Sequence, residues 1–209
     1  MQAMKNVLLL GATGMAGSAL AKKLLADTDC RLTLFARRAG EMYAGTDRIT
    51  VVNGNAERIE ELQVVMPGQD VVYCAISGDA LPRIAKNITA AMLAANVEHL
   101  IFMGAVGIYN EIPDEIDGED NLDNEPAQLP NRKAADIVEA SSLNYTVLCP
   151  GYLREVREDD YVLAVKGEPA RGCTTPLPAL VRFAAQLILD DTLYAKESVS
   201  ITRDAAKTS

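Results

Sequence analysis

The chain has 209 residues, of which 49% are apolar and 23% are charged, and its formal net charge is -9. This composition predicts a globular chain of about one domain, which we expect to span residues 1–209. The acidity argues against binding to nucleic acid or to anionic membrane surfaces, because both select basic proteins.

Short apolar runs alternate with stretches of helical periodicity along most of the chain. Residues 6–10 (NVLLL) are continuously apolar, as expected of a strand that is buried on both faces. In the stretch that follows, Ala16, Leu20 and Leu24 recur at helical spacing. The same criteria predict further strands at 31–36, 49–56, 70–76, 99–105, 144–151 and 197–202. They predict helices at 15–27, 57–66, 82–96, 132–142 and 177–191.

The alternation stops between Asn110 and Gln128, where the chain is acidic and is interrupted by Pro113, Gly118 and Pro126. We expect a long irregular loop here, and loops of this length in compact domains are usually functional or mobile. Its carboxylates raise the alternative of a metal site, but their spacing does not match the EF-hand pattern of calcium ligands. We favour a solvated, mobile lid and no metal; an acidic lid would repel anionic ligands.

Strands that alternate with helices indicate an α/β fold, a doubly wound parallel sheet with helices on both faces. In such sheets, ligands bind outside the carboxyl ends of the strands. The residues that directly follow each strand are therefore the candidates for a binding site.

The first strand is followed by GATGMAG, with glycines at positions 11, 14 and 17. Gly11 would permit a tight turn, Gly14 a close approach of the backbone to a pyrophosphate, and Gly17 close packing of helix on strand. Free N–H groups at the start of the helix would then favour phosphate. The motif predicts a bound nucleotide that contacts Gly11, Thr13, Gly14 and Met15. The alternative is a glycine-rich turn without a ligand.

The second strand is followed by two arginines. NAD-binding folds usually carry an acidic residue here, which accepts a hydrogen bond from the ribose 2′-hydroxyl. This chain instead has Ala36 followed by Arg37 and Arg38. Paired guanidiniums suit a 2′-phosphate because their donors match its oxygens. NADP is therefore the expected cofactor and NAD the alternative, unless the two arginines form a solvated surface pair.

The ends of the third and fourth strands extend the same site. We expect Asn55 to hydrogen-bond the adenine edge and Ala56 to pack on the ring. Ala75 and Ile76 are small or apolar, so that the chain can pass close to a dinucleotide.

Five stretches together make the chain similar to an atypical short-chain dehydrogenase/reductase of the NmrA-like, NAD(P)H-binding branch. They are VLLLGATGMAGSALAKKLL, LFARR, the GNA after the third strand, AANVEHLIFMGAVGIY and NYTVLCPGYL. The similarity runs from about Lys5 to Arg203. It implies a Rossmann domain that binds NAD(P), with residues 152–197 contributing a small substrate-side portion.

Catalytic members of the wider family use a tyrosine as acid and base, a lysine four residues later, and a serine after the fifth strand. The resemblance places the lysine at Lys133, the tyrosine at Leu129 and the serine at Ala105. Leucine cannot transfer a proton, so a general acid worth about 10²-fold or more in rate is missing. The resemblance implies that Lys133 hydrogen-bonds the nicotinamide ribose; the alternative is a solvated lysine on a helix.

Four ring-bearing residues have different expected roles. Tyr109 is a weak candidate for a substitute proton donor, because a tyrosine in this pattern more often packs or lines the loop. Pro150 and Tyr152 follow the sixth strand, and we expect them to contact the cofactor, with Tyr152 covering the nicotinamide. His99, the only histidine, stands at the start of the fifth strand, away from its carboxyl end, and is interpreted as structural.

The cysteines indicate a reducing compartment. Cys30, Cys74, Cys149 and Cys173 form no C-x-x-C pair, and Cys74 and Cys149 lie in apolar runs. We expect buried free thiols and a cytoplasmic protein. The apolar run near the N-terminus is too short for a signal peptide, and no run approaches the length of a membrane span.

Two functions fit these features. The first is an NADP-dependent oxidoreductase on a small acceptor, such as a quinone or flavin, which needs no Tyr–Lys pair. The second is a non-catalytic NADP(H) sensor that passes redox state to a protein partner, as NmrA-like regulators are thought to do. An isomerase or epimerase is disfavoured because the tyrosine and the serine are missing. A purely structural domain would leave the residues at the strand ends unexplained.

Overall fold

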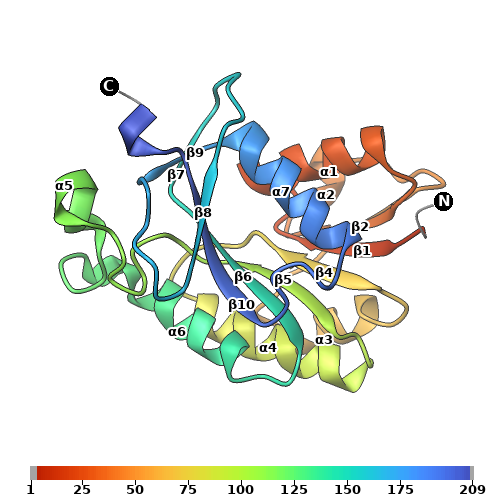
Figure 1. Cartoon of the computed structure of the whole chain (residues 1–209). Helices are drawn as coiled ribbons and strands as arrows, with labels where there is room; N and C mark the ends of the chain where they lie inside the picture. The colour runs from red at the N-terminus through yellow and green to blue at the C-terminus, as the bar shows by residue number, and fades with distance from the viewer. Residues whose placement is uncertain (1–3, 208–209) are drawn as a thin grey trace.

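The computed structural model describes residues 4–207, so the two ends of the predicted 1–209 domain lie outside the described residues. Its main sheet has eight strands in the order β3-β2-β1-β4-β5-β6-β10-β8 (Figure 1). They are β1 (Asn6–Leu10), β2 (Arg31–Ala36), β3 (Ile49–Asn53), β4 (Val71–Cys74), β5 (His99–Met103), β6 (Asn144–Pro150), β8 (Val162–Val165) and β10 (Glu197–Thr202). All neighbours are parallel except β8, which runs antiparallel to β10. The strand order reverses between β1 and β4, which makes this the topological switch point.

Helices cover both faces of the sheet. The helices are α1 (Met15–Asp27), α2 (Ala39–Met42), α3 (Ile59–Val65), α4 (Leu81–Ala94), α5 (Asp114–Asp117), α6 (Leu129–Glu139) and α7 (Leu177–Leu189). Helices α1 and α7 pack together on one face, and α3, α4 and α6 cover the other (Figure 1). The predicted doubly wound parallel sheet is confirmed.

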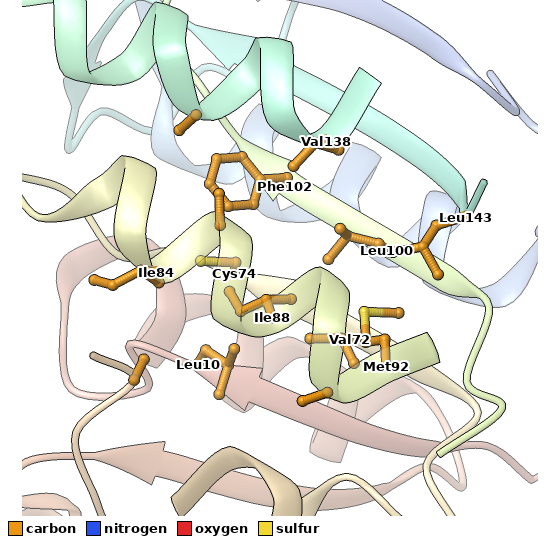
Figure 2. Packing of buried hydrophobic residues seen from close by; sticks show 14 of the residues in the cluster. Leu10, Val72, Cys74, Ile84, Ile88, Met92, Leu100, Phe102, Val138 and Leu143 are labelled. Carbon is orange, nitrogen blue, oxygen red and sulfur yellow. The ribbon is translucent and has the colours of Figure 1, made fainter. Parts of the chain in front are cut away.

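The core has two layers, one on each side of the sheet. In β1, Val7 and Leu9 face the layer under α1 and α7, whereas Leu8 and Leu10 face the layer under α3, α4 and α6. All four side chains are fully buried, which confirms the prediction of a strand buried on both faces. Each such burial contributes about 1.5–3 kcal/mol. Figure 2 shows Leu10 and its neighbours from β4 and β5 packed against α4 and α6.

The predicted elements are present, with shifted ends and some omissions. Besides α2, α5 and β8, the prediction missed β7 (Tyr152–Arg154) and β9 (Thr174–Pro176), which form a separate parallel pair. The helix expected at 132–142 begins at Leu129 instead. Pro130 lies in its first turn, where the missing N–H is not needed and the fixed φ angle suits a helix. Lys133 is therefore the fifth residue of α6 rather than a first-turn residue.

The acidic segment is partly ordered, so the expectation of an irregular loop from 110 to 128 is wrong in part. It contains α5 and two 3₁₀ turns, Gly118–Asp120 and Pro126–Gln128. The side chain of buried Asn121 accepts from the Ile112 N–H at 3.0 Å and donates to the Ile112 carbonyl at 2.8 Å. The Leu122 N–H donates to the Gly107 carbonyl at 2.9 Å. The predicted mobility of the acidic segment, residues 110–128, stays a prediction.

The remaining expectations concern the cysteines, metals and membranes. All four cysteines are free; Cys74 and Cys149 are buried as predicted, Cys30 is also buried, and Cys173 is half-buried. Across residues 4–207, no group of His, Cys, Asp and Glu side chains could hold a metal ion. None of the helices in this part of the chain has the length and apolar character needed to cross a bilayer.

Candidate dinucleotide-binding site

A cavity of about 340 Å³ lies at the carboxyl ends of β1, β2, β3 and β4 and therefore includes the switch point. Nine of the predicted cofactor-binding residues line it: Gly11, Thr13, Gly14, Arg37, Arg38, Asn55, Ala56, Ala75 and Ile76. Residues far apart in the chain meet here because parallel strands end at the same edge of the sheet.

The turn after β1, residues 11–14, is here called the phosphate loop. Gly11 has a φ of +82°, and a Cβ there would lie 2.9 Å from the Ala75 carbonyl oxygen, so glycine is required. A Cβ on Gly17 would lie 2.3 Å from the Gly11 carbonyl oxygen, which explains how α1 approaches the loop so closely. A Cβ on Gly14 would meet only the Gly11 oxygen, at 3.4 Å. Because Gly14 lines the cavity, its missing side chain leaves space for a ligand rather than for protein.

The phosphate loop holds most of its own amides and leaves one free. The N–H groups of Gly11 and Ala12 both donate to the Phe35 carbonyl, at 3.0 and 3.3 Å, and the Gly14 N–H donates to the Gly11 carbonyl at 3.0 Å. Within the described part of the chain, the Thr13 N–H meets no acceptor. No side chain caps the N-terminus of α1 either. The free donor and the positive end of a 13-residue helix together suit an anion.

The two arginines give the cavity a basic end in an otherwise acidic chain. Both side chains are exposed. The Arg38 Nε lies 3.7 Å from the Glu41 carboxylate, and an ion pair this exposed contributes little to stability. Arg37 makes no ion pair with any of the described residues. Both guanidiniums are therefore available to a phosphate.

The end of the cavity beyond β3 is shaped by a turn with fixed hydrogen bonds. The Asn55 backbone N–H donates to the Glu61 carboxylate at 2.7 Å, and the Asn55 Oδ1 accepts from the Glu57 N–H at 3.1 Å. The hydrogen bond from Asn55 is the largest cause of the lowered pKa of Glu61. Within residues 4–207, the Asn55 side-chain amide nitrogen donates no hydrogen bond. Glu57, which lines the cavity, is neutralised by an ion pair with Arg83.

Four predicted cofactor-binding residues do not line this cavity: Met15, Lys133, Pro150 and Tyr152. Met15 is half exposed at the start of α1, and Lys133 is exposed on α6. The Pro150 carbonyl accepts from the Val106 N–H at 2.9 Å, and the Tyr152 hydroxyl donates to Asp120 at 2.9 Å.

The last two of these residues, Pro150 and Tyr152, stand at and just after the end of β6, two strands beyond β4. Neighbouring strands lie about 4.8 Å apart, so this position is about 10 Å farther along the same edge. A ligand that extended from the cavity along the edge would reach it.

Tyr109, the weak proton-donor candidate, lies outside the cavity. Its hydroxyl donates to the Glu139 carboxylate at 2.6 Å, and burial, together with nearby Cys149 and Glu139, raises its pKa. His99 is buried at the opposite end of β5, and burial lowers its pKa to about 4.

The sequence interpretation missed several residues that line the cavity. They include Glu57, Ser77, Asp79 and Ile84. The signal was present for Ser77 and Asp79, because both follow directly after the fourth strand. Glu57 and Ile84 lie in the stretches 57–66 and 82–96, for which the sequence pattern predicts a helix and no ligand contact.

The sheet order, the cavity at the switch point and the phosphate loop define a Rossmann-fold dinucleotide-binding protein. The family model described as NAD(P)H-binding matches residues 11–191. The chain belongs to this NAD(P)H-binding family, which confirms the predicted resemblance to NAD(P)H-binding proteins.

Solved structures agree in fold. A Rossmann-fold NAD(P)-binding family protein from Shigella flexneri is 30% identical, with a TM-score of 0.83 over 97% of this chain and 95% of that chain. A short-chain dehydrogenase/reductase from Veillonella parvula, solved in complex with NADP, is 23% identical, with a TM-score of 0.88 over 97% and 96%. ChuY, an anaerobillin reductase from Escherichia coli O157:H7, is 14% identical, with a TM-score of 0.77 over 95% and 97%. No curated protein is similar enough to count as a match.

Proposed function

We propose that the protein is an NADP-dependent oxidoreductase that passes hydride to a small acceptor of quinone or flavin type without a Tyr–Lys dyad. The observation that carries this proposal is the meeting of Arg37 and Arg38 with the phosphate loop in one cavity. A free loop amide and two available guanidiniums are the donors that a pyrophosphate and a 2′-phosphate need. The space left by Gly14 fits the same ligand.

Each predicted residue has a role in this proposal. The phosphate loop, with Met15 at the start of α1, binds the pyrophosphate, and the arginines bind the 2′-phosphate. Asn55 and Ala56 bind the adenine, and Ala75 and Ile76 line the path beside β4. Farther along the edge, Lys133 holds the nicotinamide ribose, while Pro150 and Tyr152 contact the nicotinamide.

The reduced nicotinamide supplies hydride when it is bound. A quinone or flavin can accept hydride and take its proton from water, so the protein needs no general acid. Leu129 and Tyr152, which are 42% and 59% exposed, offer apolar surface to a flat aromatic acceptor. We assign residues 152–197, which include the β7–β9 pair, to the substrate-side portion.

A non-catalytic NADP(H) sensor is the second candidate. Two observations favour it. Leu129 stands four residues before Lys133, where the resemblance implies a tyrosine in catalytic members. The Tyr109 hydroxyl is bound to Glu139. In this case the protein would bind NADPH and pass its redox state to a protein partner. The four free thiols suit a cytoplasmic location for either function.

One experiment separates the two functions. The purified protein is titrated with NADPH and NADH by fluorescence, and quinones and flavins are then added while the absorbance of the reduced cofactor is followed. Oxidation of NADPH with any of these acceptors supports the oxidoreductase. Tight binding without oxidation supports the sensor. Failure of both nucleotides to bind at micromolar concentrations would contradict both.

A further inference from the structure

A tyrosine outside the cavity is hydrogen-bonded to the backbone of the phosphate loop. The Tyr43 hydroxyl donates to the Ala12 carbonyl oxygen at 2.7 Å. Ala12 stands between Gly11 and Thr13, which both line the cavity, whereas Tyr43 does not. Tyr43 therefore contacts the wall of the cavity, at the loop, without lining the cavity itself.

Contacts on three sides hold Tyr43 in place. Its backbone N–H donates to the Ala39 carbonyl at 2.9 Å, which ends α2. Its ring is partly buried against the apolar layer under α1 and α7. The Gly40 N–H donates to the Asn53 side chain at 2.8 Å and ties α2 to the end of β3. A tyrosine hydroxyl is protonated at neutral pH, and burial raises the pKa of Tyr43 further.

The geometry of the peptide bond transmits this contact to the cavity. The peptide unit that joins Ala12 and Thr13 is planar and trans, so its C=O and N–H point in opposite directions. Because the Ala12 carbonyl is held toward Tyr43, the Thr13 N–H points away from Tyr43. This N–H is the loop amide for which the described residues provide no acceptor.

We propose that Tyr43 is a positioning residue that presents the Thr13 N–H to the pyrophosphate of the dinucleotide. The inference rests on the proposed nucleotide-binding function and deepens it. The Ala12 N–H is fixed on the Phe35 carbonyl, so Tyr43 supplies the second point that prevents the Ala12–Thr13 peptide from turning. Without the hydroxyl, the Thr13 amide loses its fixed direction, and a pyrophosphate must order it on binding.

The test is Tyr43→Phe, which keeps the ring and removes the hydroxyl. Dissociation constants are measured for NADPH, for NADH and for adenosine 2′-monophosphate, which lacks a pyrophosphate and relies on the arginines. We expect the dissociation constants of both dinucleotides to increase by about threefold to tenfold, which is the effect of losing one hydrogen bond. The constant for adenosine 2′-monophosphate stays unchanged.

The matched control is Tyr145→Phe. Tyr145 is a partly buried tyrosine of β6 whose hydroxyl meets no partner in the described structure. This variant should bind all three ligands as the wild type does. Thermal unfolding of both variants shows whether either change alters the fold as a whole.

Two results would overturn the inference while leaving the proposed function intact. One is an unchanged NADPH affinity in Tyr43→Phe. The other is an equal loss for adenosine 2′-monophosphate and NADPH, which would make Tyr43 a general support of the site. If the wild type bound neither dinucleotide, the proposed function would fail, and the inference would fail with it.

Discussion

The Tyr109 hydroxyl donates a hydrogen bond to the Glu139 carboxylate at 2.6 Å, and this contact joins the segment after β5 to the end of α6. Ser198 of β10 and Lys166 donate to the same carboxylate, at 2.6 and 2.7 Å. Burial favours the neutral form of Glu139, but hydrogen bonds from Lys166, Ser198 and Tyr109 outweigh it and lower the pKa. The cluster therefore fixes α6, the helix that carries Lys133, against the sheet.

We expect Tyr109→Phe to reduce stability and to leave cofactor binding unchanged. The ring keeps its contacts with the cations of Arg132 and Lys166, which lie 5.0 and 4.5 Å from its centroid. Loss of a hydrogen bond to an ionised carboxylate should lower the free energy of unfolding by about 1.5–3 kcal/mol, as measured by urea denaturation. If Tyr109 were instead the proton donor, turnover with a quinone would fall by about 10²-fold or more.

Replacement of both Arg37 and Arg38 by alanine should weaken NADPH binding far more than NADH binding. Charge-assisted hydrogen bonds to a phosphate contribute about 1.5–3 kcal/mol, so the NADPH dissociation constant should rise by about tenfold to a hundredfold. Fluorescence titration measures both cofactors. Arg31→Ala is the control, because Arg31 is an exposed arginine at the other end of β2. An equal loss of affinity for NADPH and NADH would show that Arg37 and Arg38 do not bind the 2′-phosphate.

Lys133→Met should weaken NADPH binding more than it slows any chemical step. The proposed partner of Lys133 is the nicotinamide ribose, so the KM for NADPH should rise while kcat changes little. Lys86→Met is the matched control, since Lys86 is an exposed lysine on α4. Normal NADPH binding by Lys133→Met would show that this lysine is only a solvated surface residue.

Stability should decrease as the pH falls from 7 to 5, because of His99. Burial lowers its pKa from 6.5 to about 4, so the folded state binds fewer protons than the unfolded state in this range. The stability that neutral His99 contributes to the fold is fully present above pH 6.5 and is lost as the pH falls toward 4. The loss should reach about 2 kcal/mol at pH 5.

Urea denaturation at a series of pH values measures this loss, and His99→Phe, which keeps a flat ring, is the comparison. The variant should lack the decrease between pH 7 and 5, where few carboxylates titrate. His99 is the only histidine, so no other imidazole contributes. If the free energy of unfolding of His99→Phe decreased by the same amount between pH 7 and 5, His99 would not be the cause of the decrease.

The sequence was sufficient where structure depends on local pattern. The runs 6–10, 31–36 and 197–202 match β1, β2 and β10 in both bounds. The first is a continuous apolar run, which identifies a strand buried on two faces. It was insufficient for α2, which has only four residues, too few to show a period. The antiparallel pairing of β8 with β10 depends on contacts between residues more than thirty positions apart, which no local pattern encodes.

Some residues of the candidate site could also be predicted from the local sequence pattern, and others could not. Residues next to strand ends were found because parallel strands end at one edge. The contact between Tyr43 and Ala12 joins residues 31 positions apart and depends on where α2 directs the chain after β2. No motif in the sequence marks it.

Leu129 is 42% exposed, so a tyrosine could replace it and give the protein a general acid. An exposed side chain can be exchanged for a larger one without repacking the core, so Leu129→Tyr would place a phenol four residues before Lys133. With Ala105→Ser, the chain would carry all three groups that catalytic relatives use. The double variant should reduce a simple ketone with NADPH, measured as loss of NADPH absorbance. Carbonyl reduction with an acid and hydride transfer without one could then be compared on a single scaffold.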